Sequence, residues 1–226
     1  MKVLYEDNHI IIVNKASGEI VQSDKTGDKT VAEDVKQYIK KAYAKPGEVF
    51  LGIPHRLDRP VSGAVVLART SKSLARLNDM FRNGEVKKTY WAITKNTPKE
   101  LEGTLEHWLV RNEQQNKSYA YNREKPRSKK AILHYKVIGR TDNYCLIEVE
   151  LMTGRHHQIR SQLAAIGCPI KGDLKYGAKR SNVDGSISLL ARRVSFVHPV
   201  SKANIDVVAP VPDDALWKYF EESQEG

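Results

Sequence analysis

The sequence predicts an α+β fold built on a mainly antiparallel mixed sheet with flanking helices. The first observation is that runs of alternating apolar and polar residues come in pairs joined by short turns, as at residues 131–137 and 145–151. The second is that few segments have the apolar spacing of a helix. Strands that follow one another without an intervening helix pair most simply as antiparallel neighbours.

The N-terminal part of the chain contains three predicted strands. Residues 3–5 and 10–13 are apolar runs separated by the turn residues of 6–9, so we expect a strand pair. Residues 64–68 are apolar and rich in β-branched side chains, which predicts a buried strand.

Two helices are expected around that strand. Thr30 and Glu33 form a capping-box pattern that predicts the start of a helix over residues 31–44. Ser71 is expected to cap a second helix. The buried stripe of this second helix and its left-handed end are predicted at Leu74, Leu77, Phe81 and Gly84.

The remaining elements follow the same patterns. Residues 87–93 predict a strand, and residues 154–167 predict a helix with Ile159 buried and Arg160 close to the solvent or to the edge of the site. Two late strands and a closing helix are expected at residues 188–197, 205–209 and 213–220.

The net charge indicates a polyanionic partner. The 226 residues contain 37 lysines and arginines against 27 aspartates and glutamates, a formal charge of +10. The surplus is concentrated between residues 111 and 140, whereas the last fourteen residues are acidic. A clustered surplus of this kind is typical of a protein with a polyanionic partner, rather than of a charge that only maintains solubility.

The cysteine content and the N-terminus indicate the compartment. Cys145 and Cys168 are the only cysteines, and they have neither the number of a disulfide framework nor the spacing of a zinc site. The longest early apolar run, residues 10–13, is too short to span a membrane. We therefore expect a cytoplasmic protein with no membrane partner, and a monomer by default.

A dense group of charged residues precedes the predicted strand at 64–68. His55, Arg56, Asp58 and Arg59 lie within five residues. The flanking arginines are expected to keep Asp58 ionised, which suits a nucleophile or an electrostatic stabiliser. From residue types alone, an aspartate that only caps a turn and pairs with an arginine remains the alternative.

The stretch H-R-L-D-R-P-V-S-G around Asp58 resembles the catalytic motif of the RluA-type pseudouridine synthases. Four further motifs of that family follow in the same order, and together they extend over residues 3 to 212. They are K-T-Y at 88–90, G-R-H-H-Q-I-R at 154–160, G-D-L-K-Y-G at 172–177 and F-V-H-P at 196–199. Two positions depart from the pattern, with Val61 in place of threonine and Leu190 in place of histidine.

The resemblance implies a pseudouridine synthase fold and a single catalytic domain over residues 1–226, without the family's N-terminal RNA-binding domain. It implies an isomerase that converts specific uridines of ribosomal or transfer RNA to pseudouridine. Neither a cofactor nor a metal is expected, because the base is detached, turned and rejoined without redox chemistry.

The resemblance also assigns roles to individual residues. Asp58 is the expected nucleophile, Tyr90 the ring that stacks on the flipped uracil, and Arg160 the ion-pair partner of Asp58. The expected substrate-binding residues are Arg56, His55, Lys88 and Arg155, with His55 supporting the Asp58 loop and Lys88 contacting phosphate.

Residues 112–130 are highly charged and show little periodicity, so we expect an exposed insertion or hairpin. Tyr119 and Tyr121 stand among lysines and arginines there. They can stack on unpaired bases while the cations hold phosphates, although a solvated loop explains the composition equally well.

Two other function classes remain open. One is an RNA-binding protein that kept the fold without activity, although binding alone does not require Asp58. The other is a metal-dependent nuclease using Asp58, Asp173 and a histidine. The adjacent His156 and His157 are expected to diverge on a helix, which argues against a shared metal ion.

Overall fold

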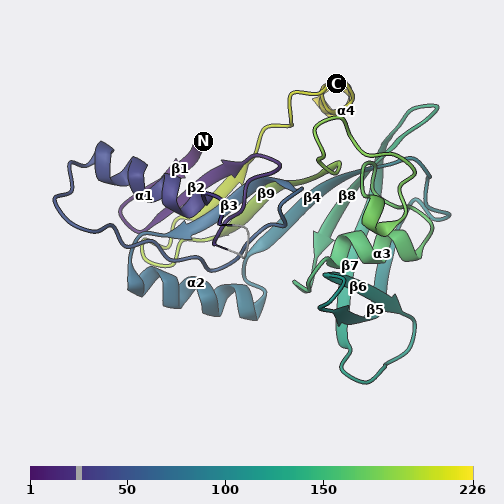
Figure 1. The fold of residues 1–226 in the computed structure, drawn as a ribbon, viewed down its shortest axis with the longest axis horizontal. Helices are drawn as coiled ribbons and strands as arrows, with labels where there is room; N and C mark the ends of the chain where they lie inside the picture. Colours follow the sequence, from purple (N-terminus) through teal and green to yellow (C-terminus); the bar gives the residue numbers. More distant parts are fainter. Residues whose placement is uncertain (24–26, 226) are drawn as a thin grey trace. The chain divides into compact units, whose positions relative to one another are not determined.

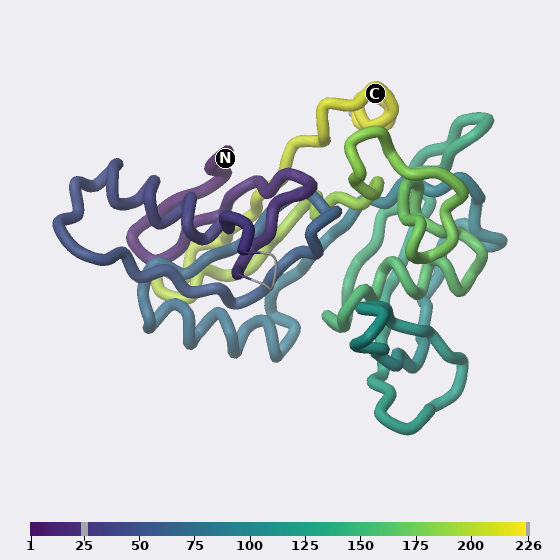
Figure 2. The backbone as a smooth tube through the Cα atoms, in the orientation of Figure 1, coloured from purple at the N-terminus to yellow at the C-terminus, as the bar shows by residue number. Residues whose placement is uncertain are grey.

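The computed structural model describes residues 1–23 and 27–225, and the chain divides into two compact units. Unit 1 comprises Met1–Lys87 and Ala191–Pro210, and unit 2 comprises Lys88–Leu190 and Val211–Gly226. The colour gradient of Figure 2 shows the composition of unit 1, in which the late segment in yellow-green runs among the first strands in purple and blue.

Unit 1 contains a sheet that joins the start of the chain to its late segment. Its strand order is β1-β2-β3-β9, with β10 paired to β9. The bounds are β1 Lys2–Glu6, β2 Ile10–Lys15, β3 Ser62–Ala68, β9 Leu189–Val197 and β10 Asn204–Val208. The β1–β2, β2–β3 and β9–β10 pairs are antiparallel. The strand predictions for residues 3–5, 10–13 and 64–68 are confirmed.

Two helices flank this sheet on opposite faces, as Figure 1 shows. Helix α1, Val31–Ala42, begins with the predicted capping box of Thr30 and Glu33. Helix α2, Ser71–Asn83, ends at Gly84 in the left-handed conformation (φ 74°), also as predicted. The residue that caps α2 is Thr70 and not Ser71, because the Thr70 hydroxyl accepts a hydrogen bond from the Ser73 N–H.

The core beneath α2 shows how the alternation along the strands builds the unit. Ile10 and Ile12 of β2, together with Val66 of β3, pack against Leu77 and Met80 of α2. Ile11 and Val13 of β2 and Val65 and Leu67 of β3 are also fully buried, and they point to the other face. A strand buried on both faces appears in the sequence as a continuous apolar run, which is the pattern of residues 64–68.

Unit 2 contains a second antiparallel series, in the order β4-β8-β7-β5-β6. Its strands are β4 Lys87–Thr94, β5 Glu102–Asn112, β6 Lys117–Tyr121, β7 Lys129–Arg140 and β8 Cys145–Leu151. Strands β7 and β8 form the predicted hairpin, and β5 and β6 show that residues 112–130 include a hairpin rather than a structureless loop. Strand β5 was not predicted, because its residues do not alternate cleanly.

Two helices and a 3₁₀ turn complete unit 2. They are α3 Gln158–Ala165, η1 Leu174–Tyr176 and α4 Ala215–Glu225. Trp217 and Phe220 of α4 pack on Trp91 and Ile93 of β4. The helix predicted over residues 154–167 is much shorter, because His157 adopts a left-handed conformation (φ 51°) at its N-terminus.

The predicted fold class, α+β with a mainly antiparallel mixed sheet, is confirmed. The single domain over residues 1–226 stays a prediction. Among the described residues no helix has the length and apolar character needed to cross a membrane.

Gly63 is the position where the backbone of unit 1 tolerates no side chain. Its φ is +118°, and a Cβ atom there would lie 2.4 Å from the carbonyl oxygen of Ala191. We expect Gly63→Ala to lower the free energy of unfolding by about 3 kcal/mol, since overpacking adds to backbone strain. Gly84→Ala is the matched control, because φ is also positive (+74°) but the space is open. Equal losses in urea unfolding would refute the steric explanation.

Candidate active site

Asp58 lies in a loop of unit 1 that leads into β3. The loop starts at Gly52, whose N–H and carbonyl form a bridge with Ala68 at 2.8 and 2.9 Å. A tight turn follows Asp58, in which the Val61 N–H donates to the Asp58 carbonyl at 3.0 Å. The Asp58 side chain is partly exposed. A carboxylate on a loop anchored at both ends can be presented to a substrate in a fixed position.

Lys15, the last residue of β2, binds this loop through hydrogen bonds from its ammonium group. Its side chain is fully buried, and its Nζ donates to the carbonyl oxygens of Ala16 (2.9 Å), Arg59 (3.1 Å) and Val61 (2.6 Å). Two of these carbonyls lie directly after Asp58 in the sequence. Burial lowers the pKa of Lys15 to about 8, although the nearby carboxylates of Glu19 and Asp58 oppose this shift.

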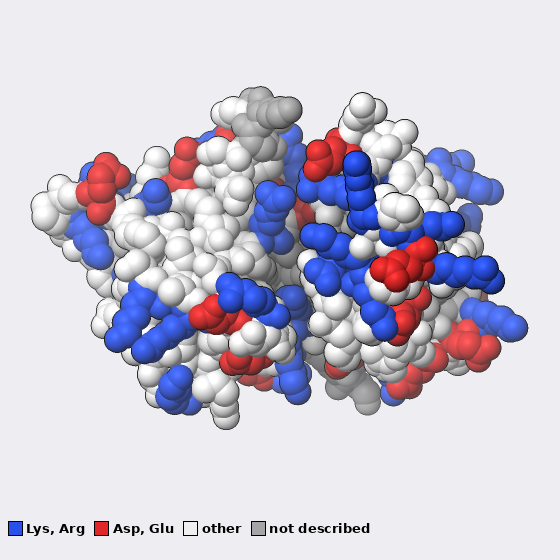
Figure 3. Space-filling model, turned by 90° about the horizontal axis from the view of Figure 1, so that it is seen from below, with Lys and Arg blue, Asp and Glu red and all other residues white. Residues whose placement is uncertain are grey.

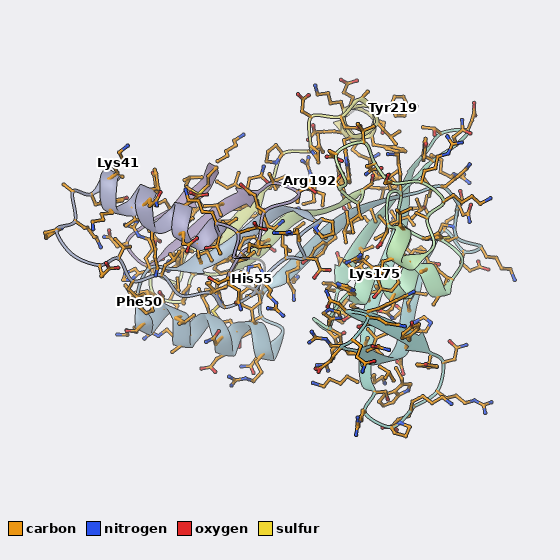
Figure 4. The ribbon with its side chains drawn as sticks, in the orientation of Figure 1. Lys41, Phe50, His55, Lys175, Arg192 and Tyr219 are labelled. Carbon is orange, nitrogen blue, oxygen red and sulfur yellow. The ribbon has the colours of Figure 1, made fainter. Side chains whose placement is uncertain are left out.

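His55 supports the same loop from its other end. Its Nε2 accepts a hydrogen bond from the Val66 N–H of β3 at 2.9 Å, and its ring stacks on Phe81 of α2 at 4.5 Å. An Nε2 that accepts carries no proton, so the neutral ring is protonated at Nδ1. Figure 4 labels His55 close to α2 of unit 1. The expected supporting role agrees with these contacts, and a direct contact with RNA stays a prediction.

The two arginines that flank Asp58 differ in their surroundings. Arg56 is exposed, as expected of a residue that contacts substrate. Arg59 forms an ion pair with Asp28 and its carbonyl accepts from the Gly18 N–H at 2.8 Å. Arg59 thus connects the Asp58 loop to the segment between β2 and α1.

Arg160 is the centre of a polar network in unit 2. Its Nε and Nη2 donate to the two carboxylate oxygens of Asp173 at 2.7 and 2.9 Å, which is a bidentate ion pair. Arg160 and Asp173 are 5% and 1% exposed, so Arg160 does not lie at the solvent edge, and its expected position at the edge of the site stays a prediction. Burial of this charge is tolerated because Asp173 neutralises it.

His157 extends the network from Arg160 towards the β5–β6 hairpin. Its Nε2 lies 3.0 Å from Nη1 of Arg160, and its Nδ1 lies 2.9 Å from the Tyr176 hydroxyl. An arginine can only donate, so Nε2 accepts and the neutral ring donates from Nδ1 to Tyr176. Burial lowers the pKa of His157 to about 2, with smaller contributions from Arg160, His156, Lys175 and Arg111. The Tyr176 oxygen also accepts from the Ser118 N–H of β6 at 2.8 Å.

Tyr90 and Lys88 project from β4 within the same unit. Tyr90 is 8% exposed and lies opposite Val149 of β8. Because side chains alternate along a strand, Tyr90 faces away from α4, which packs on Trp91. Burial lowers the pKa of Lys88. Its Nζ lies 3.6 Å from where a Cβ atom at Gly154 would lie, which is an ordinary van der Waals contact, so Lys88 passes close to the backbone at Gly154.

Arg155 and Gln158 fix the loop between β8 and α3. The Arg155 Nε donates to the Lys130 carbonyl at 3.0 Å, and its N–H donates to Oε1 of Gln158 at 3.0 Å. Gln158 in turn donates to the Ile132 carbonyl at 3.0 Å. Arg155 therefore has a clear structural contact, and its expected role in substrate binding stays a prediction.

The structure places the residues singled out from the sequence in two groups. Unit 1 contains Asp58, Arg56 and His55, and unit 2 contains Tyr90, Lys88, Arg155 and Arg160. The ion pair expected between Arg160 and Asp58 stays a prediction, and within unit 2 the partner of Arg160 is Asp173.

Sequence reasoning missed the importance of Lys15 and His157. The available signal for Lys15 was a charged residue two positions after the apolar run of residues 10–13, which is also how an ordinary strand end appears in a sequence. For His157 the expectation was a helical residue diverging from His156, but the two rings stack at 3.8 Å. That expectation failed because His157 precedes the helix.

The described residues contain no group of three or more histidine, cysteine or acidic side chains arranged to hold a metal ion. Asp173, a ligand in the nuclease hypothesis, has both of its carboxylate oxygens in hydrogen bonds with Arg160. The two cysteines are free thiols, and both are buried.

Comparisons with known proteins place the chain in a family. A family model described as RNA pseudouridylate synthase matches residues 9–165. The uncharacterized RNA pseudouridine synthase YhcT of Bacillus subtilis is 33% identical over 218 residues, which are 95% of this chain and 70% of that protein. Ribosomal large subunit pseudouridine synthase D of Zymomonas mobilis is 30% identical over 230 residues, with the same two coverages.

Similarity to solved structures supports the same fold. The human RNA pseudouridylate synthase domain containing 4 superimposes with a TM-score of 0.79, over 99% of this chain and 92% of that chain, at 24% identity. The chain therefore belongs to the RNA pseudouridylate synthase family, and its relatives include members of the RluA type. The expected enzyme class, an isomerase that forms pseudouridine in RNA, is confirmed at the level of the family. The chain spans 66% of the length of one relative from Synechocystis and 70% of the length of YhcT and of the Zymomonas enzyme.

Replacement of Lys15 tests the support of the Asp58 loop. We expect Lys15→Met to lower the free energy of unfolding by at least about 2 kcal/mol, because three carbonyl oxygens lose their donor. We also expect pseudouridine formation to fall further than RNA affinity. The exposed Lys40→Met of α1 is the control in both assays. Unchanged stability and turnover in Lys15→Met would show that the loop does not depend on this lysine.

The pKa of His157 predicts a specific dependence of stability on pH. The folded value of about 2 lies below the usual 6.5, so between these values the unfolded state binds the additional proton. The free energy of unfolding should therefore fall on acidification from pH 6.5, by up to about 1.4 kcal/mol per pH unit. We expect His157→Gln to remove this part of the slope in urea unfolding at pH 7 and pH 5. An identical slope in the wild type and in His157→Gln would contradict the assignment.

Proposed function

We propose that this chain isomerises uridine to pseudouridine in ribosomal or transfer RNA, with Asp58 as the nucleophile. The observation that carries the proposal is the placement of Asp58 on a loop held at both ends. His55 ties the start of this loop to β3, and Lys15 binds the carbonyls that follow Asp58. Membership of the family over residues 9–165 supports the reaction class, and the naming of one relative as a ribosomal large subunit enzyme supports ribosomal RNA.

The reaction makes three demands on the residues. The bond between the base and the ribose must break, the base must turn, and a carbon must be joined to the ribose in place of the nitrogen, with that carbon losing its proton and the freed nitrogen gaining one. Asp58 serves as the nucleophile, and Tyr90 provides an aromatic ring for the extracted base. Arg160 supplies a fixed positive charge that is already oriented by Asp173 and His157.

Binding of the RNA is assigned to cationic residues around these groups. Arg56 is exposed and lies two residues before Asp58. Its role is either to enter the gap that the flipped base leaves in the RNA or to bind the phosphate of the flipped nucleotide. Lys88 and Arg155 suit phosphate contacts. The net charge of +10 supports a polyanionic substrate and predicts that affinity falls with increasing salt.

Asp58→Asn tests the nucleophile. RNA from a strain that lacks this protein would be incubated with the purified chain in the presence of a chelator, and new pseudouridines would be mapped by carbodiimide labelling and primer extension. We expect one or a few new sites with the wild type and none with Asp58→Asn, because an amide is not a comparable nucleophile. RNA affinity should remain close to that of the wild type.

The matched control is Asp79→Asn, which removes an exposed carboxylate of α2 without touching the loop. Turnover by Asp58→Asn close to that of Asp79→Asn would refute the nucleophile role. Cleavage of the RNA in a parallel incubation without the chelator, and no cleavage with it, would support the alternative of a metal-dependent nuclease. Binding without product, both on folded RNA and on deproteinised precursor RNA, would indicate the inactive RNA-binding alternative.

A further inference from the structure

The outer face of the β5–β6 hairpin exposes aromatic rings that the reaction does not use. Side chains alternate along β6, so Lys117, Tyr119 and Tyr121 point to one face. Tyr119 and Tyr121 are 36% and 38% exposed, whereas Ser118 between them is 2% exposed and faces the Tyr176 network. The hairpin therefore has one face committed to the interior of unit 2 and one face open to solvent.

The register of the strands brings a third ring to this open face. Trp108 of β5 lies directly opposite Tyr121 of β6 and, on its other side, opposite Lys130 of β7. Residues directly opposite each other point to the same face of a sheet. Trp108 is partly exposed, in contrast to Trp91 and Trp217, which are 7% and 4% exposed.

Cations lie beside these rings. The Lys117 Nζ is 5.2 Å from the centroid of the Tyr119 ring and equally far from that of Tyr176, and the Lys125 Nζ is 5.9 Å from that of Tyr121. In Figure 3, Lys and Arg side chains are spread over much of the surface of unit 2 that faces the viewer. We refer to the six residues Trp108, Lys117, Tyr119, Tyr121, Lys125 and Lys130 as the hairpin platform.

The platform is held in place by the polar network of unit 2. Lys175 donates to the carbonyls of Gln115 and Asn116 in the β5–β6 turn at 3.2 and 3.1 Å. His156 contacts the side chains of Asn116 at 3.1 Å and Ser118 at 2.9 Å. Figure 4 labels Lys175 within this unit. A surface ordered before binding loses less conformational entropy when a ligand binds.

We propose that the hairpin platform binds a single-stranded segment of the RNA substrate by stacking bases on Tyr119 and Tyr121, while the lysines contact phosphates. The proposal rests on the proposed function, because that function makes RNA the partner. Open rings next to cations suit unpaired nucleotides, since every base has a face that stacks and every nucleotide carries a phosphate. An acidic peptide would use the lysines but would have no need for the rings.

The test measures binding of a short single-stranded oligouridylate to the full chain at low salt, by anisotropy of a labelled oligonucleotide and by quenching of intrinsic tryptophan fluorescence. We expect quenching in the wild type, because Trp108 is the partly exposed tryptophan. Trp108→Phe should lose most of the quenching and keep binding by anisotropy. Binding without quenching in the wild type would place the RNA elsewhere and overturn the proposal.

Removal of the rings gives the decisive comparison. We expect Tyr119→Ala/Tyr121→Ala to weaken binding by at least about 25-fold, and Tyr119→Phe/Tyr121→Phe to bind within about 3-fold of the wild type. The phenylalanine pair also controls for misfolding, because it retains both aromatic rings and their packing. Tyr219→Ala is the matched control, since Tyr219 is 53% exposed on α4, far from the hairpin in Figure 4. Equal affinities for the alanine pair and this control would refute the platform.

Two competitors and one activity assay identify the partner. An oligomer of abasic nucleotides, or polyglutamate, that binds as tightly as the oligouridylate would show a site for anions alone and refute stacking. Failure of the platform appears as normal binding by the alanine pair while the wild type forms pseudouridine. Failure of the proposed function appears as absent product while ring-dependent binding persists.

Discussion

The buried ammonium group of Lys15 is the interaction on which the geometry of the Asp58 loop depends. A charged side chain inside a protein is costly unless its hydrogen-bonding groups are satisfied. The three donors of Lys15 meet three carbonyl oxygens, of which those of Arg59 and Val61 follow Asp58 directly. Lys15 also lies opposite Gly63 in the β2–β3 register, and the backbone at Gly63 approaches Ala191 too closely for any side chain. The segment that carries the candidate nucleophile is therefore positioned by three features, which are the β2–β3 pairing, Lys15 and Gly63.

Unit 2 orders its candidate residues by a different principle. Arg160 is fixed by a bidentate bond to Asp173, and this fixed donor determines which nitrogen of His157 is protonated. With its Nε2 accepting, His157 donates a hydrogen bond from Nδ1 to the Tyr176 oxygen. The same oxygen also accepts a hydrogen bond from the Ser118 N–H. A chain of hydrogen bonds thus links the arginine to the β5–β6 hairpin. A charge that is oriented in advance needs little reorganisation when a substrate binds.

Much of the fold was predictable because its elements carry strong local signals. The capping box at Thr30 and the left-handed Gly84 appear where the sequence predicted them. The errors have physical causes. Helix α3 starts late because His157 leaves the helical conformation to join its network, and Thr70 rather than Ser71 caps α2 because its hydroxyl is the one within reach of the Ser73 N–H. Strand β5 escaped detection because its residues do not alternate cleanly, with the polar His107 on its buried face and Trp108 on its open face.

The sequence by itself determined the fold class, the family and the candidates Asp58, Tyr90 and Arg160, since short motifs and apolar periodicity are properties of neighbouring residues. Only the tertiary structure decided that Lys15 supports the Asp58 loop, 46 positions away at Val61, and that Asp173 is the partner of Arg160 within unit 2. It also decided that Trp108 joins Tyr121 on one face, through the register of β5 and β6. These are contacts between distant segments, and they depend on strand register and burial, which arise only when the chain has folded.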